Sequence, residues 1–592
     1  MADRTLSFLL TVSLFAIFPF FSDPSTTAKT LIVATTTLVI YLFVKQLSIP
    51  IHASLLSCAL IVVYAISSWG TVGQYSIFAL ILAFLLFLLV YNFYSFDSFC
   101  CVVSVLVTIV SLLGVYEYFS FRLLGPSREM LIPWILPRDS SYRIGGVVGQ
   151  PNLFAAFLLA SVFPFIFYYY NHVGKIRNAL LKKISLAPFG VVFLCFFWTF
   201  SRSVFLAYLC LVLLFFFFRK KISTILSHDE FRVLYSVFFV SLGCFVLSLL
   251  VDHCFSTSVN RLAANMGGFS IVSRFVLWLS GFLMFKDNLF YGVGLHNYRL
   301  YLDDYLIPVH DMLKFVLYRD FPYTDWAHNE FIQLIAEGGV LALLIIACAL
   351  YFFIKSFLEN RDRESYYLFL VLFVLIFHSM FSWTLRHPTL FVLFIFACGL
   401  LLKKKNIRCV SFSVGGLSKI FIGAGIVFVL YVGSSEYQYY KFFAEVRTGN
   451  LNIAKFENLY VNDYVRFELL QKSLPVILKN VLQEKDVTKL KWLSPYLKEI
   501  ATIQGADWQW YNYSLAILIC GDRVEARKAI ENALHTAPLN EKYWAFLHYI
   551  NILNLSESRG VGLEYFFHED SESMDVSSFL DSLGPIGLMS DD

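Results

Sequence analysis

The sequence is poor in charged residues and has no paired-cysteine motif. Of its 592 residues, 15% are charged and 58% are hydrophobic, which excludes an ordinary soluble protein of this length. Most of the 11 cysteines lie inside apolar runs and none forms a CxxC pair, so neither a zinc site nor a disulfide framework is indicated. The net charge of +4 is small. The chain is therefore expected to lie in a lipid membrane, with no metal, no cofactor and no nucleic-acid partner.

Apolar runs that could cross a bilayer recur along residues 1–434. A hydrocarbon core about 30 Å thick needs roughly 20 apolar residues of helix, and shorter runs span it when polar flanks reach the headgroups. The first run lacks a small-residue cleavage site, so it is expected to remain as a membrane helix. We predict about 13 transmembrane helices, near residues 6–21, 30–46, 52–70, 76–95, 99–119, 153–170, 186–200, 203–218, 233–251, 331–354, 365–383, 388–402 and 418–434.

Clusters of Lys and Arg predict the orientation of these helices. Cytoplasmic loops of membrane proteins are rich in Lys and Arg, and four loops that follow even-numbered spans are basic. Their basic residues are Lys175, Arg177, Lys182 and Lys183; Arg219, Lys220 and Lys221; Lys355, Arg361 and Arg363; and Lys403, Lys404, Lys405 and Arg408. The N-terminus is therefore predicted to be cytoplasmic. The long segments 120–152 and 252–330, and the chain beyond about 435, are predicted to face the periplasm.

The second of these segments contains an amphipathic stretch. Val272, Phe275, Leu279 and Phe282 recur at helical spacing within 271–285. This pattern predicts a helix that lies along the membrane surface.

Beyond residue 434 the composition becomes that of a soluble protein, and residues 435–570 are predicted to form an all-helical periplasmic domain. Residues 508–544 are similar to one tetratricopeptide unit, with a helix, a turn at Gly521 and Asp522, a second helix and a stop at Pro538. The final residues 571–592 are rich in Ser and Asp and are predicted to be a disordered tail. The predicted fold class is an all-α polytopic membrane protein with a helical, tetratricopeptide-like domain.

Three arginines lie where a predicted span meets the periplasmic face, or in the loops beside it: Arg143, Arg202 and Arg274. An arginine near membrane depth is costly unless it is paired or hydrated. A diphosphate is a suitable partner, because its oxygens accept two parallel hydrogen bonds from a guanidinium. A cluster of such arginines could stabilise a leaving diphosphate without a metal. Alternatively, each arginine reaches lipid phosphates or pairs with a carboxylate such as Asp139 or Asp287.

The run DWAHNEFIQLIAEGG places His328 and Asn329 just outside the tenth predicted span. An imidazole that titrates near neutrality can take a proton from an attacking hydroxyl, and Glu330 or Asp325 could orient the ring. The alternative is a helix-capping Asn329 beside an interfacial histidine.

The run GGVVGQPN combines glycines, which permit close approach of the backbone, with the amides of Gln150 and Asn152. These amides can hold sugar hydroxyls or phosphate oxygens. The alternative is a glycine-rich turn with an Asn cap. DNLFYGVGLHNY at 287–298 could likewise be only a tight loop, and structural roles are favoured for His378, Arg386 and His387.

Together these segments resemble the O-antigen ligase superfamily. The resemblance rests on RIGGVVGQPN at 143–152, SRS at 201–203, SRFVLW with the DNLFYGVG turn at 273–294, and HNEFIQLIAEGG at 328–339. Their order and their predicted placement on one membrane face match the family. The GQPN segment and the large C-terminal domain are similar to the bacterial protein O-oligosaccharyltransferases, including those that glycosylate pilins.

The resemblance implies an inverting, metal-independent transfer of an oligosaccharide from undecaprenyl diphosphate to Ser or Thr hydroxyls of periplasmic or pilin proteins. It implies a protein of the bacterial inner membrane with a periplasmic active site. Within that site, His328 would activate the acceptor, and Arg202 and Arg274 would bind the diphosphate. The remaining substrate-binding candidates are Arg143, Gln150, Asn152 and Asn329.

One departure from the family pattern concerns the region after His378. Some relatives carry a glutamate a few residues after the corresponding histidine, whereas this chain has Phe381, Ser382 and Trp383. A catalytic role for this region is therefore not expected.

Two other functions stay open at this point. Ligation of O-antigen to lipid A core, or polymerisation of its repeat units, would use the same donor. A protein acceptor is favoured because the additional helical domain lies on the predicted acceptor side. A transporter of lipid-linked glycans would carry ionisable residues near the bilayer midplane, often in two related halves, whereas the polar residues here gather at one predicted face.

Overall fold

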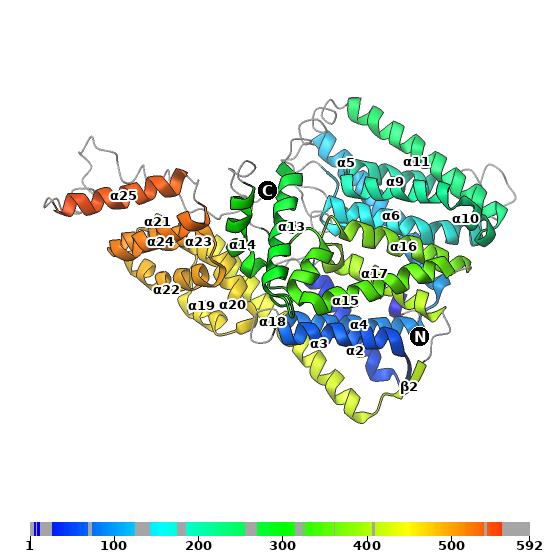
Figure 1. Ribbon diagram of the computed structural model, residues 1–592, viewed down its shortest axis with the longest axis horizontal. Helices are drawn as coiled ribbons and strands as arrows, with labels where there is room; N and C mark the ends of the chain where they lie inside the picture. The colour runs from blue at the N-terminus through cyan, green and yellow to red at the C-terminus, as the bar shows by residue number, and fades with distance from the viewer. Residues whose placement is uncertain are drawn as a thin grey trace. The chain divides into compact units, whose positions relative to one another are not determined.

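The computed structural model describes residues 5–7, 9–11, 26–68, 74–124, 143–173, 185–254, 269–313, 324, 326–359, 362–404, 409–537 and 541–558. This part of the chain is helical, apart from one short pair of strands and the connecting segments (Figure 1). The predicted all-α membrane fold is confirmed. The chain divides into two compact units.

The first unit comprises Met1–Arg274, Asn288–Leu295 and Trp326–Gly433. Helices occupy the positions of the second to the thirteenth predicted spans, whereas most of the first lies outside the described residues. The helices are α2 (Thr26–Phe43), α3 (Ile51–Ser67), α4 (Gln74–Phe93), α5 (Phe96–Leu124), α6 (Pro151–Tyr168), α8 (Ala187–Trp198), α9 (Arg202–Phe217), α10 (Arg219–Ile225), α11 (His228–Cys254), the start of α13 (Phe269–Asp287), α15 (Glu330–Glu359), α16 (Arg363–Ser379), α17 (Pro388–Lys403) and the first part of α18 (Gly416–Arg447).

Within the described residues, five helices are long and apolar enough to cross a membrane: α5, α6, α11, α15 and α18. The pair α9 and α10, bent by 80°, would make a sixth. Several other helices, including α8 and α17, are apolar but shorter. The membrane fold is therefore clear, while the total of 13 spans stays a prediction.

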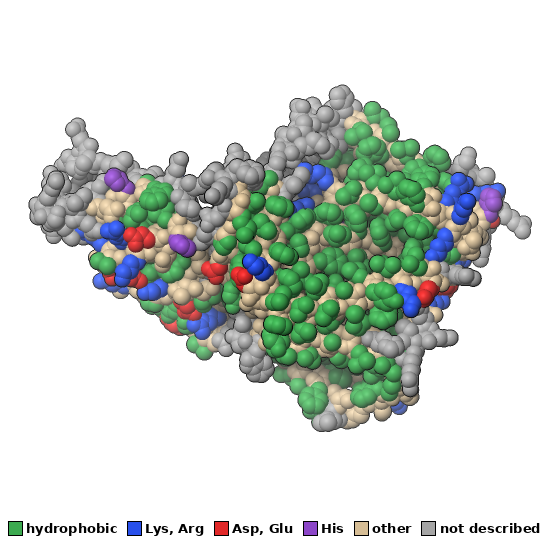
Figure 2. All heavy atoms as spheres, viewed as in Figure 1, with side chains coloured by type: hydrophobic (Ala, Val, Ile, Leu, Met, Phe, Trp, Pro, Cys, Tyr) green, Lys and Arg blue, Asp and Glu red, His purple; other side chains and the backbone are tan. Residues whose placement is uncertain are grey.

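Apolar side chains cover the outside of this unit as well as its core. Figure 2 shows a broad hydrophobic surface, and α3, α9, α11 and α15 each expose several Leu, Val or Phe side chains. Lys and Arg gather at the end of the unit where α10 lies (Figures 1 and 2). An apolar surface of this kind, with charges at its end, is typical of helices embedded in lipid.

The one strand pair in the described residues joins two loops far apart in sequence. Strand β1 (Gln46–Pro50) pairs antiparallel with β2 (Cys409–Ser413), in a register that places Ser48 opposite Ser411. The pairing requires the loops after the second and twelfth predicted spans to lie on the same side of the membrane. The predicted topology meets this requirement, since both loops follow even-numbered spans.

The second unit comprises Phe275–Asp287, His296–Asp325 and Ser434–Asp592. Asp522 caps α24 by accepting a hydrogen bond from the backbone N–H of Glu525, and Gly521 takes a positive φ of 97° just before it. The predicted helix, turn and helix are thus present as α23 and α24, whereas the tetratricopeptide class stays a prediction, and Pro538 and residues 571–592 lie outside the described residues. The helices are the rest of α13 (Phe269–Asp287) and α18, α14 (Tyr298–Met312), α19 (Ile453–Tyr460), α20 (Asp463–Glu468), α21 (Leu474–Glu484), α22 (Val487–Gln504), α23 (Asp507–Ile519), α24 (Arg523–Thr536) and α25 (Glu541–Ser558).

Candidate active site

All seven predicted site residues belong to the first unit, and two of them lie in the loop that precedes α6. Two buried ionisable side chains hold this loop by its backbone. The carboxylate of Glu117, on α5, accepts hydrogen bonds from the N–H groups of Gly145 (3.1 Å) and Gly146 (2.8 Å). The Lys29 ammonium, on α2, donates to the carbonyl of Val147 (2.9 Å).

Gly146 is required in this loop because its φ is +54° and a Cβ there would lie 2.7 Å from the ring of Phe154. The backbone of the loop is thus constrained by hydrogen bonds on one side and by packing on the other. Sequence reasoning missed Glu117. Its signal was an acidic residue inside an otherwise apolar span, which is costly in lipid unless it is satisfied.

Arg143 joins this loop to the hairpin formed by α8 and α9. Its Nη2 donates to Asn152 Oδ1 (2.7 Å) and its Nε donates to the Thr199 carbonyl (2.8 Å). Thr199 lies in the short link that ends at Ser201, directly before Arg202. The segment RIGGVVGQPN therefore contacts the link that leads into SRS.

The alternative that Asn152 merely caps α6 is wrong, because Gln150 occupies the cap position and Asn152 binds Arg143 instead. The side chain of Gln150 is exposed, and it makes no cap hydrogen bond. The two amides predicted to hold substrate thus differ. Asn152 orients an arginine, whereas Gln150 faces outward from the same loop.

Arg274 lies close enough to Arg202 and His328 to act on both electrostatically. Burial lowers the pKa of Arg274, and the positive charge of Arg202 lowers it further. Within the part of the chain that the structure describes, no hydrogen bond or ion pair engages the Arg274 guanidinium. The predicted alternative of pairing with Asp287 is therefore not what the structure shows, and Asp139 lies outside the described residues. Two nearby cations, one of them half-buried and unpaired, favour an anionic ligand.

His328 is held in a strained backbone conformation from both sides. Its φ is +51°, in the left-handed region that costs a non-glycine residue about 1–2 kcal/mol. The N–H of Ala327 donates to Gln333 Oε1 (3.0 Å), and Asn329 Oδ1 accepts from the N–H groups of Phe331 and Ile332 at the start of α15. The capping role weighed for Asn329 is thus correct, and only its amide nitrogen is left for a substrate.

The imidazole of His328 is neutral near neutral pH. Burial lowers its pKa to about 4, and the positive charge of Arg274 contributes in the same direction. A neutral ring has a free lone pair and can accept a proton. The residue is therefore in the protonation state that a general base requires.

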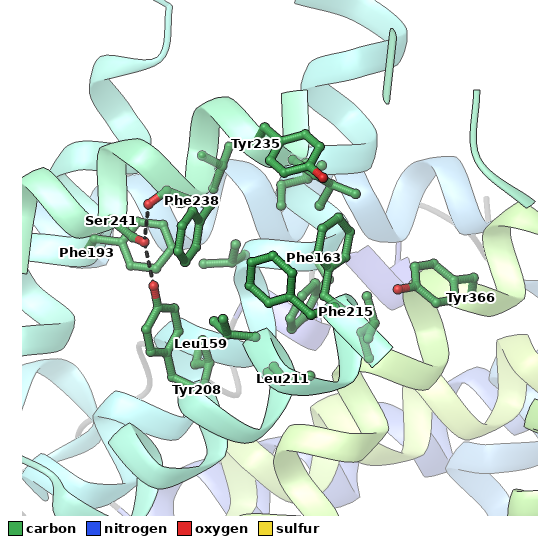
Figure 3. A pocket seen from close by; sticks show the side chains of 17 residues that line it. Leu159, Phe163, Phe193, Tyr208, Leu211, Phe215, Tyr235, Phe238, Ser241 and Tyr366 are labelled. Carbon is green, nitrogen blue, oxygen red and sulfur yellow. Dashed lines mark hydrogen bonds between the residues drawn. The ribbon is translucent and has the colours of Figure 1, made fainter. Parts of the chain in front are cut away.

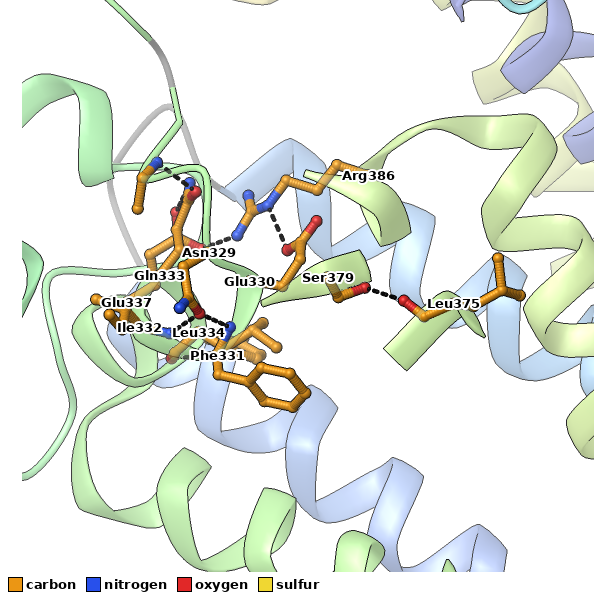
Figure 4. Close-up of polar contacts among 12 residues, drawn as sticks. Asn329, Glu330, Phe331, Ile332, Gln333, Leu334, Glu337, Leu375, Ser379 and Arg386 are labelled. Carbon is orange, nitrogen blue, oxygen red and sulfur yellow. Dashed lines mark hydrogen bonds and ion pairs between the residues drawn. The ribbon is translucent and has the colours of Figure 1, made fainter. Parts of the chain in front are cut away.

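A buried ion-pair network links the start of α15, two residues after His328, to Arg386 (Figure 4). Arg386 donates to Glu330 Oε2 (3.1 Å) and to Glu337 Oε2 (2.8 Å), and Gln333 Nε2 donates to Glu337 Oε1 (2.9 Å). The prediction that Glu330 could orient the His328 ring is therefore wrong, since its carboxylate pairs with Arg386, and Asp325 lies outside the described residues. Arg386 has the structural role that was favoured for it.

The turn at 287–294 packs against a break in α15 through backbone hydrogen bonds. The N–H groups of Val293 and Gly294 donate to the carbonyls of Ala336 and Glu337 (both 2.9 Å), and Val340 N–H donates to the Leu289 carbonyl (2.7 Å). The break falls at Gly339, which has a φ of +65°. These contacts explain why a DNLFYGVG turn and an AEGG sequence occur together, and they hold α15 on both sides of its break.

Replacing Gly339 with Ala is expected to destabilise the protein by more than about 1 kcal/mol, because the added Cβ would lie 2.5 Å from the Phe290 carbonyl in a backbone conformation that favours glycine. The midpoint of thermal unfolding in detergent would fall by several degrees. Gly243→Ala, on α11, is the matched control, since nothing lies within 4 Å of its added Cβ. Equal midpoints for the two variants would contradict the role given to this break.

The fold and the site together define a class of protein: an all-helical membrane protein with a cationic site beside a neutral histidine. Residues 187–347 match the family model described as O-Antigen ligase, which confirms the resemblance to the O-antigen ligase superfamily. The matched segment contains Arg202, Arg274, His328 and Asn329. The chain is accordingly a membrane enzyme of lipid-linked glycan transfer. No curated protein matches the chain.

Proposed function

We propose that this protein transfers an oligosaccharide en bloc from undecaprenyl diphosphate to Ser or Thr hydroxyls of periplasmic or pilin proteins. The observation that carries the proposal is the placement of Arg274 within electrostatic range of both Arg202 and His328. A diphosphate that leaves a sugar develops negative charge, and a hydroxyl that attacks the sugar must lose a proton. The three side chains supply both functions.

In this reaction the acceptor oxygen forms a bond to the anomeric carbon as the bond from that carbon to the diphosphate oxygen breaks. Attack opposite the leaving group inverts the configuration. The proton of the hydroxyl passes to the neutral imidazole of His328, and the charge that develops on the diphosphate is balanced by Arg274 and Arg202. Such preorganised charges act more strongly where water is excluded, since they need not reorganise during the reaction.

Arg143 and Asn152 would complete the donor site from the neighbouring loop. Arg143 donates hydrogen bonds to two neutral oxygens, the Thr199 carbonyl and Asn152 Oδ1, and these two contacts do not cancel its positive charge. Gln150 is exposed beside them and is suited to contact a sugar hydroxyl.

Ligation of O-antigen to a lipid acceptor, or its polymerisation, is the second candidate. The description of the matched family model favours ligation. A protein acceptor is favoured by the extra helices of the second unit, α19 to α25, because an acceptor already in the membrane should not need a domain of this size. The proposed placement is the bacterial inner membrane, with the N-terminus cytoplasmic and both the site and the C-terminal domain periplasmic.

The test is the intact mass of periplasmic and pilus proteins from cells with the wild-type chain, with His328→Ala, or without the gene. We expect a glycan-sized mass on a Ser or Thr peptide in wild-type cells, and its loss in the other two. Unchanged protein masses together with altered lipopolysaccharide banding would reject the protein acceptor and assign the protein to O-antigen ligation or polymerisation.

A further inference from the structure

The first unit contains an apolar cavity that the proposed reaction does not use (Figure 3). It has a volume of about 110 Å³ and is lined by side chains of α6, α8, α9, α11 and α16. Its lining is almost wholly aliphatic and aromatic, and the hydroxyls of Tyr208 and Ser241 hydrogen-bond to each other (2.7 Å). A cavity with so few free polar groups stays dry and takes an apolar ligand. In a membrane protein that ligand is a segment of hydrocarbon chain.

The cavity lies near the basic end of the helices that line it. Phe215 is two residues before the end of α9, Tyr366 is three residues after the start of α16, and Tyr235 is seven residues after the start of α11. At 1.5 Å per residue these positions are roughly 3–10 Å from the helix ends. A chain in the cavity would therefore belong to a lipid of the leaflet at this end.

Arg202, where the donor diphosphate is proposed to bind, lies at the other end of α9 from the basic end. Tyr208 and Phe215 lie 6 and 13 residues after Arg202 on α9, which is roughly 9–20 Å along the helix axis. The α9 residues that line the cavity lie roughly 40–180° around the helix from Arg202. A donor with its diphosphate at Arg202 would have its headgroup at the opposite end of α9 from the basic end, so a lipid of the leaflet at the basic end is the better occupant.

Two exposed cations lie at this end without a side-chain partner. Among the described residues, no hydrogen bond or ion pair engages the side chains of Arg219 and Lys220, which begin α10, and both are exposed. Their neighbour Lys221 differs, because its Nζ donates to the carbonyls of Phe357 and Leu358 at the end of α15.

The acidic residues at the start of α11 do not neutralise these cations. Asp229 pairs with Arg232 (3.2 Å), and the buried Glu230 pairs with Arg363. The uncompensated charge at this end is therefore positive, which complements a phosphate headgroup.

We propose that this cavity binds an acyl chain of an anionic phospholipid from the adjoining leaflet, with the headgroup phosphate held by Arg219 and Lys220. The cavity holds part of the chain, and the rest lies along the apolar outer surface of α9 and α11. The lipid fills the space between the α8–α9 hairpin and α11, and so supports the hairpin that carries Arg202 at its tip. The proposal requires that the first unit crosses a bilayer, but it does not depend on the reaction or the acceptor proposed above.

The test uses the full-length protein in vesicles that contain phosphatidylglycerol with a diazirine on its acyl chain. After irradiation, we expect cross-links on peptides of α9 and α11 that line the cavity, and at least threefold fewer with a matched phosphatidylcholine probe. Cross-links elsewhere on the helices, or equal labelling by both probes, would overturn the proposal. If an added polyprenyl diphosphate displaces the phosphatidylglycerol probe and abolishes its cross-links, the cavity is assigned to the donor instead.

Two variants test the parts of the site separately. Leu211→Trp, which fills the cavity, is expected to lower cross-linking at least fivefold, whereas Leu213→Trp, on the exposed side of the same helix, should leave it within twofold. Lys220→Gln is expected to lower the amount of phosphatidylglycerol retained by the purified protein about fivefold. A basic residue near an anionic lipid contributes about 1 kcal/mol to binding. Lys355→Gln, whose ammonium already faces Glu359, should change the amount retained by less than twofold. Full retention of phosphatidylglycerol by Lys220→Gln would show that Lys220 does not hold the headgroup phosphate. This test stands even if Leu211→Trp fails to fold.

Discussion

Replacing His328 with Ala is expected to reduce glycan transfer by at least about 100-fold, because removal of a positioned general base typically costs that much. The ring is half-buried and neutral, and the backbone on both sides of it is held by Gln333 and by the Asn329 cap. The variant should still enter the membrane, since those contacts use neighbouring residues. The measurement is turnover of a lipid-linked oligosaccharide by purified protein. Turnover within fivefold of the wild type would show that His328 is not the general base of the reaction.

The pH dependence of the wild-type reaction gives an independent check on this role. With a pKa of about 4, the ring stays neutral well below neutrality, so the rate should hold as the pH falls and decline only near that value. Arg274→Gln removes a positive charge that lowers the pKa of His328. The variant should be less active, and the acid limb of its pH–rate profile should move to higher pH. An acid limb at the ordinary histidine value of about 6.5 in the wild type would show that burial does not lower the pKa of this ring.

Replacing Arg202 with Lys is expected to lower turnover by about 100-fold, as is found when a single oxyanion-stabilising donor is lost. Lysine keeps the charge but has no planar fork for two parallel bonds to a phosphate. Stability should change little, because Arg202 is exposed at the first position of α9. The turnover number is the quantity to measure, at saturating donor.

Arg232→Lys is the matched control for this variant, since Arg232 is exposed near the start of α11 and pairs with Asp229. It should leave turnover unchanged. If Arg202→Lys also keeps full turnover, Arg202 acts at most as a point charge, and the bidentate contact proposed for it is wrong.

The helices and their ends follow closely from local features of the chain. Apolar runs bounded by polar residues predicted α5, α9 and α17 to within a few residues, because burying apolar surface decides where a helix lies in a membrane. The turn at Gly521 and Asp522 followed from a glycine that accepts a positive φ and an aspartate that caps a helix. The candidate residues His328, Arg202 and Arg274 also followed from the sequence, because an ionisable group beside an apolar span is costly unless it has a purpose.

What the sequence alone determined is therefore the membrane fold, the helix positions and the types of residue at the site, since each depends on interactions within a few residues along the chain. Only the tertiary structure decided which distant groups meet. The carboxylate of Glu117 could have bound any of several loops, and Glu330 pairs with Arg386 rather than with its near neighbour His328. The turn before Leu295 and the break at Gly339 likewise form their backbone hydrogen bonds only when the fold brings the two segments together. Such pairings depend on packing across the bundle, where a buried polar group takes whichever partner the fold brings within reach.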